Sequence, residues 1–320
     1  MIKAGIIGGA GYTAGELLRL LINHPEVEIA FVHSTSNAGN AVSSVHTSLF
    51  GECDLRFSAE HNLQAIDVLF ICSAHGESGK FLTENEIPEG LRIVDLAQDF
   101  RDESNGFVYG LPELNRERTR GAMRVANPGC FATAIQLALL PLAAKGLLTE
   151  EVHITAITGS TGAGVKPSAT THFSWRASNI SVYKSFEHQH LKEIGRNLRL
   201  LQPSFDHELN FVPLRGDFTR GILASAYTDC PLTQEEAEVL YNDYYADAAF
   251  TFISERNIDL KQVVNSNKAL VHVEKHGSKL HIVTVIDNLL KGASGQAVQN
   301  MNLMFGLDER CGLHLKGSAF

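Results

Sequence analysis

The stretch Gly8-Gly9-Ala10-Gly11-Tyr12-Thr13-Ala14-Gly15 decides the fold of the first part of this chain. It follows the apolar run Ala4–Gly8 and opens a helical pattern, Ala14–Asn23. Glycines at this spacing allow a tight turn and a close backbone approach to a ligand, and the helix start then offers N–H groups and a positive dipole end to a pyrophosphate. The strand–turn–helix context favours a dinucleotide over the alternative, a glycine-rich turn that serves packing only.

Further apolar runs define two domains. In the first third, short expected strands alternate with helical patterns, which indicates βαβ units and a parallel sheet: Ala4–Gly8, Val27–His33, Val68–Ser73 and Arg92–Leu96. The second half has longer expected strands: Val152–Ser160, Phe211–Pro213, Ile222–Asp229, Ala269–Lys275 and Lys279–Asp287. We predict an α/β protein with a Rossmann-type domain at 1–129, to which the C-terminal helix at 299–320 returns, and an α+β catalytic domain at 130–298.

Composition excludes several classes of protein. The formal net charge is −9, which argues against a nucleic-acid binder. No apolar run reaches the roughly 18 residues of a membrane span, and the N-terminus does not resemble a signal peptide. The cysteines are odd in number and widely spaced, so we expect neither a disulfide framework nor a metal site, and we expect a cytoplasmic location: Cys53, Cys72, Cys130, Cys230 and Cys311.

The loop after the second expected strand bears on the choice of cofactor. It reads Ser34-Thr35-Ser36-Asn37 and has no acidic residue to bind an adenine-ribose hydroxyl. Hydroxyls and amides suit a 2′-phosphate better, so NADP(H) is favoured, although no arginine lies in this loop. The alternative is an ordinary polar loop. The residues expected to bind the cofactor here are Gly8, Gly9, Ala10, Gly11, Tyr12, Thr13, Ser34, Ser36 and, after the strand Val68–Ser73, His75.

Cys130 has the setting of a reactive thiol. It follows Asn127-Pro128-Gly129 and precedes the apolar helical pattern Ala132–Lys145. A helix N-terminus favours the thiolate. A thiolate can displace phosphate from an acyl phosphate and later release an aldehyde. The alternative, a buried structural thiol, is the expectation for Cys72.

Several motifs in a fixed order resemble one family. They are Gly8–Leu17, Asp95–Arg101, Tyr109–Glu113, Asn127–Thr133, Gly159–Gly164, His188–Ile194, Phe218–Ile222 and Asp287–Ala293. Together they resemble the N-acyl-γ-glutamyl-phosphate reductases of arginine biosynthesis, which share their fold with the aspartate-semialdehyde dehydrogenases. The resemblance implies a catalytic domain of the semialdehyde dehydrogenase type. It also implies that Cys130 forms a thioester, which NADPH reduces to the semialdehyde, with His188 or His190 as general acid and base.

The resemblance also suggests contacts for the substrate and for the nicotinamide. Expected substrate-binding residues are Arg101, Asn127, Ser160, Lys166 and Arg220, and Gly162 and Asn288 are expected on the cofactor side. Leu214-Arg215 departs from the family pattern, and the extra cation raises the hypothesis of a succinyl rather than an acetyl substrate. We expect a homo-oligomer, a dimer or a tetramer. The rival hypotheses are an aspartate-semialdehyde or aminoadipate-type dehydrogenase and a nucleotide-sensing protein without chemistry.

Overall fold

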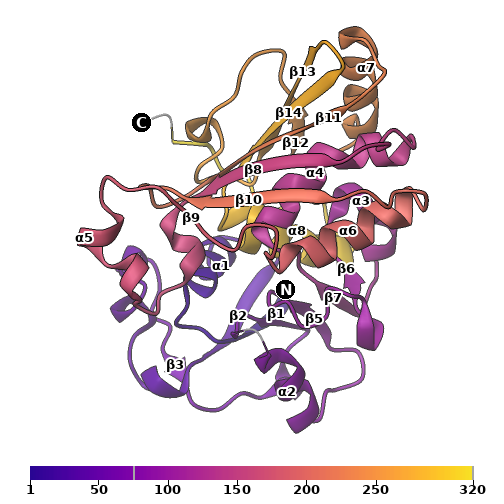
Figure 1. Ribbon diagram of the computed structural model, residues 1–320. Helices are drawn as coiled ribbons and strands as arrows, with labels where there is room; N and C mark the ends of the chain where they lie inside the picture. The colour runs from indigo at the N-terminus through magenta and orange to yellow at the C-terminus, as the bar shows by residue number, and fades with distance from the viewer. Residues whose placement is uncertain (75, 319–320) are drawn as a thin grey trace. The chain divides into compact units, whose positions relative to one another are not determined.

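The computed structural model describes residues 1–74 and 76–318 and divides the chain into two compact units (Figure 1). Among the described residues, the first unit contains Met1–Pro128 and Ala293–His314, and the second contains Gly129–Gly292 and residues 315–318. The sequence placed the first boundary at 129/130 and the return at 299–320. The chain returns earlier, at Ala293, and leaves the first unit again after His314. His75, an expected cofactor residue, lies outside the described residues.

A seven-stranded parallel sheet forms the centre of the first unit. Its strands are β1 (Ile2–Ile7), β2 (Val27–His33), β3 (Phe57–Ser58), β4 (Val68–Ile71), β5 (Arg92–Asp95), β6 (Val108–Tyr109) and β7 (Arg124–Ala126). They lie in the order β3-β2-β1-β4-β5-β7-β6. The strand order reverses beside β1, and ligands bind at the carboxyl ends of the strands at such a point. The predicted Rossmann-type domain is therefore confirmed.

Helices flank this sheet: α1 (Tyr12–Leu21), α2 (Glu77–Glu84), α3 (Pro112–Thr119) and α8 (Gly295–Met304). Short 3-10 turns connect other elements: η1 (Thr35–Asn37), η2 (Val42–Ser44), η3 (Thr47–Leu49), η4 (Leu63–Ala65) and η5 (Ser104–Gly106). Every residue of α8 is buried, including its amides. The Asn300 amide donates to the Gly110 carbonyl, and Asn302 lies 3.1 Å from the His24 ring. These bonds explain why a helix so rich in amides belongs to the core of the first unit.

The second unit has a mixed sheet. Its strands are β8 (Val152–Thr158), β9 (Ser181–Val182), β10 (Leu209–Arg215), β11 (Ile222–Asp229), β12 (Thr251–Ile253), β13 (Ala269–His276) and β14 (Lys279–Ile286). They lie in the order β12-β13-β14-β11-β8-β10-β9, with β8 and β10 parallel and β11 antiparallel to both its neighbours. The hairpin β13–β14 turns at Gly277, whose φ is +57°. This mixed sheet agrees with the α+β domain predicted for the second half.

The helical elements of the second unit position the catalytic residues. They are α4 (Cys130–Ala144), α5 (Phe173–Arg176), α6 (His190–Leu201) and α7 (Gln234–Tyr245), with the 3-10 turns η6 (Ser160–Ala163), η7 (Ala169–Thr171) and η8 (Leu260–Gln262). The π-helical turn η9 (Leu290–Ser294) precedes α8. Within α4, Pro141 has no N–H to give the Leu137 carbonyl. The Tyr245 hydroxyl donates to that carbonyl instead, at 2.6 Å, so α4 remains buried without an unsatisfied group there.

Candidate active site

The glycine loop between β1 and α1 has the shape that a dinucleotide phosphate requires. Gly8 has a φ of +78°, and a side chain there would meet the Cys72 carbonyl. A side chain at Gly9 would lie 2.5 Å from Val32. At Gly11, which begins α1, the nearest atom to an added Cβ is 3.8 Å away. The framework therefore requires glycine at the first two positions, and the third leaves open space beside the start of the helix. The loop fits a pyrophosphate.

His46 closes onto this loop, and the sequence had not singled it out. Its Nε2 lies 2.7 Å from the Gly9 carbonyl oxygen. Its ring occupies the place where a side chain at Gly15 would be, because an added Cβ would lie 2.6 Å from Nδ1. Gly15, the last glycine of the motif, therefore makes room for an imidazole from a loop about thirty residues further along the chain. No pattern in the sequence links these positions.

The loop after β2 places the two serines differently. Ser34 is buried and Ser36 is exposed. The Asn37 amide donates to the hydroxyls of both, at 3.2 and 3.1 Å. The predicted residues Tyr12 and Thr13 open α1, after Ala10 in the glycine loop. The cluster of hydroxyls lies at the carboxyl end of β2, where the sequence predicted it.

Asn127 and Arg101 hold the end of the first unit, directly before the catalytic segment. The Asn127 amide donates to the Ala293 carbonyl at 3.0 Å, and its oxygen accepts from Asn300. The Arg101 Nε donates to the Asn127 carbonyl at 3.0 Å, and the side chain is buried. Both predicted substrate-binding residues thus also fix the backbone at the point where the chain leaves this unit.

Cys130 is the first residue of α4, so its predicted position at a helix start is confirmed. Gly129 caps the helix, and its N–H donates to Glu193 Oε2 at 3.2 Å. Gly292 packs directly against the cysteine, because a side chain there would lie 2.9 Å from the Cys130 Cβ. The two glycines allow two segments distant in sequence to approach the thiol-bearing residue. The helix dipole favours the thiolate at this position.

The two predicted histidines lie beside this helix start but differ in setting. An added Cβ on Gly129 would lie 2.3 Å from His190 Nε2, so that imidazole packs against the residue preceding Cys130. The Glu193 carboxylate lies 4.0 Å from the same nitrogen. His188 accepts from the His190 backbone N–H at its Nδ1, at 3.2 Å. Burial, with smaller contributions from the charges of Lys184 and Arg215, lowers the pKa of His188 to about 4, so its ring is neutral at neutral pH.

Tyr183 and Arg215 complete this group. The Arg215 guanidinium lies 4.7 Å from the centre of the Tyr183 ring. Burial raises the pKa of Tyr183 to about 12, with a further contribution from Cys130, so the phenol stays protonated. The sequence singled out Arg215 as an added cation and missed Tyr183. The structure brings both to the histidines, since the Tyr183 and His188 rings are 5.9 Å apart.

Of the remaining residues predicted to bind substrate or cofactor, some form hydrogen bonds or ion pairs within the second unit and others are exposed to solvent. Arg220 forms an ion pair with the buried Asp287, with its Nε 3.0 Å from Oδ2. Asn288 accepts from the Gly221 N–H and donates to Thr161. Ser160 and Gly162 lie in η6, and Gly162 and Lys166 are exposed. Arg220 and Asn288 therefore help to shape the loop that carries η6, while Lys166 is directed to solvent.

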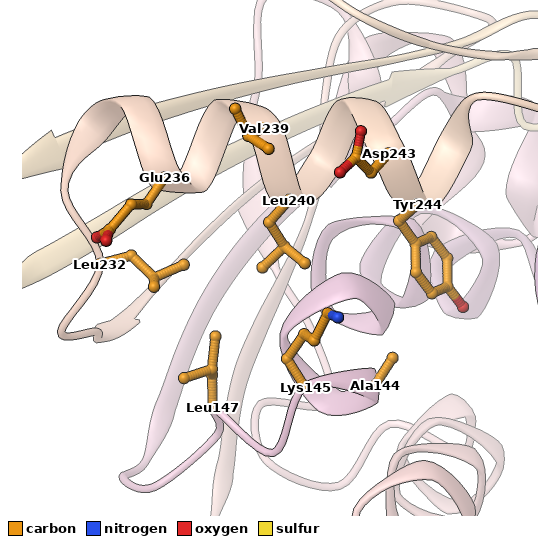
Figure 2. A pocket seen from close by; sticks show the side chains of 9 residues that line it. All are labelled: Ala144, Lys145, Leu147, Leu232, Glu236, Val239, Leu240, Asp243 and Tyr244. Carbon is orange, nitrogen blue, oxygen red and sulfur yellow. The ribbon is translucent and has the colours of Figure 1, made fainter.

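A hollow in the second unit lies away from this chemistry. Figure 2 shows it between the end of α4 and the helix α7, with Leu240, Val239 and Leu147 as its apolar lining. Cys130 is at the other end of α4, which at 1.5 Å per residue is about 20 Å away. The hollow cannot serve the thiol.

Comparison with known proteins identifies the family. The family model described as "Semialdehyde dehydrogenase, NAD binding domain" matches residues 3–122, and "Semialdehyde dehydrogenase, dimerisation domain" matches residues 130–288. The chain is 63% identical to the N-acetyl-gamma-glutamyl-phosphate reductase of Bacteroides fragilis and 62% identical to that of Bacteroides thetaiotaomicron, with 100% of each chain covered. The chain belongs to the N-acetyl-gamma-glutamyl-phosphate reductase family. The resemblance inferred from its motifs is confirmed.

Solved structures support the fold of this reductase family member. It is similar to aspartate semialdehyde dehydrogenase II from Vibrio cholerae, with a TM-score of 0.75 at 17% identity, over 96% of this chain and 98% of that one. It is also similar to the Candida albicans aspartate semialdehyde dehydrogenase solved with NADP, with a TM-score of 0.72 at 14% identity, over 95% and 98%. In the described part of the reductase, no helix is long and apolar enough to cross a membrane.

Proposed function

We propose that this enzyme reduces an N-acyl-γ-glutamyl phosphate to the N-acyl-glutamate 5-semialdehyde and phosphate, in arginine biosynthesis, with Cys130 as the nucleophile. The full-length identity to N-acetyl-gamma-glutamyl-phosphate reductases supports the reaction. The observation that carries the role of Cys130 is its position at the first residue of α4, against the two glycines and beside His190. The cofactor is NADP(H).

The chemistry proceeds through the thiol. The Cys130 thiolate attacks the γ-carbonyl carbon, the bond from that carbon to the phosphate oxygen breaks, and phosphate leaves with its electron pair. A thioester remains on Cys130. Bound NADPH supplies the hydride that reduces this thioester. The carbonyl oxygen takes a proton from a histidine imidazolium as the hydride arrives, which gives a thiohemiacetal. The imidazole takes that proton back as the carbon–sulfur bond breaks, and the semialdehyde leaves as the thiolate is restored.

We assign the proton transfers to His190 rather than to His188. The His190 ring packs against Gly129, one residue from the thiol, with the Glu193 carboxylate 4.0 Å from Nε2. A carboxylate near an imidazole favours its charged form, which a group that both takes and returns a proton requires. His188 has its Nδ1 engaged and its pKa lowered to about 4, so it is a poor proton carrier at neutral pH. We propose that His188 and Glu193 position His190.

The predicted binding residues remain proposals, some with an added structural role. For the cofactor they are the glycine loop, Ser34, Ser36, His75, Gly162 and Asn288. For the substrate they are Arg101, Asn127, Ser160, Lys166 and Arg220. Arg101 and Asn127 also hold the backbone ahead of Cys130, and Arg220 also holds Asp287. Arginine suits the carboxylate and phosphate groups of this substrate because its fork of N–H donors matches two oxygens.

A spectrophotometric assay of the reverse reaction tests the function. N-acetyl- and N-succinyl-glutamate semialdehyde are each supplied with phosphate and NADP or NAD, and NADPH formation is followed. We expect turnover that requires phosphate and prefers NADP. The ratio of the two acyl substrates tests the hypothesis based on Arg215, which equal turnover would remove. Turnover of aspartate or aminoadipate semialdehyde in preference to both would contradict the proposed substrate class.

We also propose that the enzyme is a homo-oligomer, a dimer or a tetramer, in the cytoplasm, where the Cys130 thiol stays reduced. Support for self-association comes from the match to a dimerisation domain and from large apolar side chains exposed on the second unit. Phe173 is 82% exposed and Phe186 is 60% exposed. Light scattering at micromolar concentration measures the mass directly, and a monomer would contradict the proposal.

A further inference from the structure

Arg56 lies beside the serine loop of the first unit although more than fifteen residues separate them. Backbone hydrogen bonds join the loop 34–40 to the strand β3. Ser34 N–H donates to the Ser58 carbonyl at 3.0 Å, Gly39 N–H to the Phe57 carbonyl at 2.8 Å, and Phe57 N–H to the Asn40 carbonyl at 3.0 Å. These bonds fix the position of Arg56, directly before β3, relative to the loop.

The Arg56 side chain is directed along this loop. Its Nη1 donates to the Gly39 carbonyl at 2.8 Å, and the residue is exposed. One bond of this kind engages one of the five N–H donors of a guanidinium and orients its plane. An exposed arginine held in this way presents an ordered cation to a ligand rather than a mobile one.

The same edge of the sheet carries the glycine loop. Gly9 N–H donates to the His33 carbonyl at 2.9 Å, one residue before Ser34. A side chain at Gly9 would lie 3.3 Å from the Phe57 ring, one residue after Arg56. The glycine loop and the serine hydroxyls therefore lie at the carboxyl ends of β1 and β2. The loop 34–40 runs from there to the Arg56 guanidinium, directly before β3 and within the same unit.

The charges at this edge suit an anion. The loop 34–40 contains no carboxylate that would compete for Arg56 or repel a phosphate. The nearest acidic residue along the strand is Asp54, which is exposed. The Ser34 and Ser36 hydroxyls lie 3.5 Å apart and both accept from Asn37, so they form one polar cluster. In NADP-binding Rossmann domains, an arginine near this point accommodates the 2′-phosphate.

We propose that Arg56, together with the hydroxyls of Ser34 and Ser36, binds the adenosine 2′-phosphate of NADPH and sets the preference of this enzyme for NADPH over NADH. The inference rests on the proposed function only in taking NADP(H) as the cofactor. Arg56 supplies the cation that the loop 34–40 itself lacks. Arg56 is a specificity-determining residue, since NADH has no group for it to bind.

Equilibrium binding tests this assignment without the reaction. NADPH and NADH are titrated into the full-length protein by nucleotide fluorescence, and 2′,5′-ADP and 5′-AMP are used as competitors. We expect Arg56→Ala to weaken NADPH and 2′,5′-ADP roughly tenfold to a hundredfold, the effect of losing a charge-assisted contact. NADH and 5′-AMP should change less than about twofold, because they make no such contact. Arg56→Lys should recover part of the NADPH affinity.

The controls separate a binding role from a structural one. If Arg56 only braces the loop through Gly39, the variant weakens NADPH and NADH equally, and the assignment is overturned. Arg120→Ala removes an exposed arginine of the same unit, at the end of α3, whose side chain pairs with Glu117. It should leave the NADPH-to-NADH ratio unchanged, and an equal loss there would also overturn the proposal. Because no acyl substrate is present, these outcomes are independent of whether the proposed reaction is correct.

Discussion

The helices α1 and α4 each have a glycine as N-cap, and the two helix starts are used differently. The N-cap of α1 is Gly11, where a side chain would meet nothing closer than 3.8 Å. The N-cap of α4 is Gly129, where a side chain would lie 2.3 Å from the His190 ring. The first glycine leaves space for a ligand from outside. The second makes room for a group of the protein itself.

The difference shows that a helix N-terminus can serve either to bind a ligand or to activate a thiol. Both helix starts offer backbone N–H groups and a positive dipole end. At α1 this favours a pyrophosphate, and the residues around it, Gly8, Gly9 and His46, shape the loop without filling the space. At α4 the same field favours a thiolate, and the protein places an imidazole and the Glu193 carboxylate next to it. The following predictions separate the two sites experimentally.

The largest effect should come from Cys130→Ser. A serine hydroxyl is a far weaker nucleophile at neutral pH and a poorer leaving group, so kcat should fall by roughly a thousandfold or more. The NADPH dissociation constant should stay within about twofold, because the glycine loop at α1 is unchanged. The phosphate-dependent assay and a fluorescence titration measure the two quantities. Cys311→Ser is the matched control and should retain full activity. A Cys130→Ser enzyme with more than about a tenth of wild-type kcat would remove Cys130 from the mechanism.

Substituting the two N-cap glycines should give opposite results. Gly129→Ala places a methyl group on the His190 ring, so kcat should fall about a hundredfold, in the range expected for losing a general acid and base, while NADPH binding is unchanged. Gly11→Ala has room for its methyl group, so the fold should tolerate it. It should weaken NADPH about tenfold by occupying the space beside the helix start.

The alkylation rate of Cys130 gives an independent readout for this pair. Gly129→Ala should change that rate, since the imidazole beside the thiol moves, and Gly11→Ala should not. If both variants lost NADPH binding and alkylation to the same extent, the two helix starts would not act separately and the comparison would fail.

A smaller effect is expected from Glu193→Gln. The glutamine oxygen can still accept from the Gly129 N–H, so the helix start should keep its shape. The negative charge near His190 is lost, so it no longer stabilises the charged form of that imidazole. We expect kcat to fall about tenfold at an unchanged free energy of unfolding. Glu235→Gln, at an exposed position on α7, is the control. A loss of activity that follows a loss of folding stability would make Glu193 a purely structural residue.

The smallest effect concerns stability. Burial lowers the pKa of His188 from its ordinary value of 6.5 to about 4, so protonation favours the unfolded chain. Its neutral ring costs no stability above pH 6.5, and stability is lost progressively as the pH falls from 6.5 to 4. His188→Asn should reduce the difference in unfolding free energy between pH 7.5 and pH 5 by on the order of 1 kcal/mol, after allowance for solvent screening. Urea unfolding at the two pH values measures it. An unchanged difference would mean that His188 is solvated in the folded enzyme.

Local patterns predicted the elements that carry the two helix starts. The strands β2 and β11 have the predicted bounds, and Cys130 begins its helix two residues before the predicted apolar run. The helix α6 was not predicted, although it carries His190. Its buried face includes Glu193 and Asn197, and Asn197 donates to Gln136 of α4 at 2.8 Å. Leu191, Ile194 and Leu198 recur at helical spacing, so periodicity could have found this helix. The burial of Glu193 and Asn197 depends on bonds to other elements, which an apolar pattern does not contain.

By itself, the sequence determined the glycine loop, the helix start at Cys130, the family and the class of cofactor. These depend on backbone conformations and on neighbours within a few residues, which the chain specifies locally. Only the tertiary structure decided that His190 rather than His188 packs on Gly129, that His46 closes over Gly15, and that Arg56 bonds Gly39 in the loop that carries Ser34 and Ser36. Such contacts depend on strand register and helix packing between distant segments, which no spacing along the chain encodes.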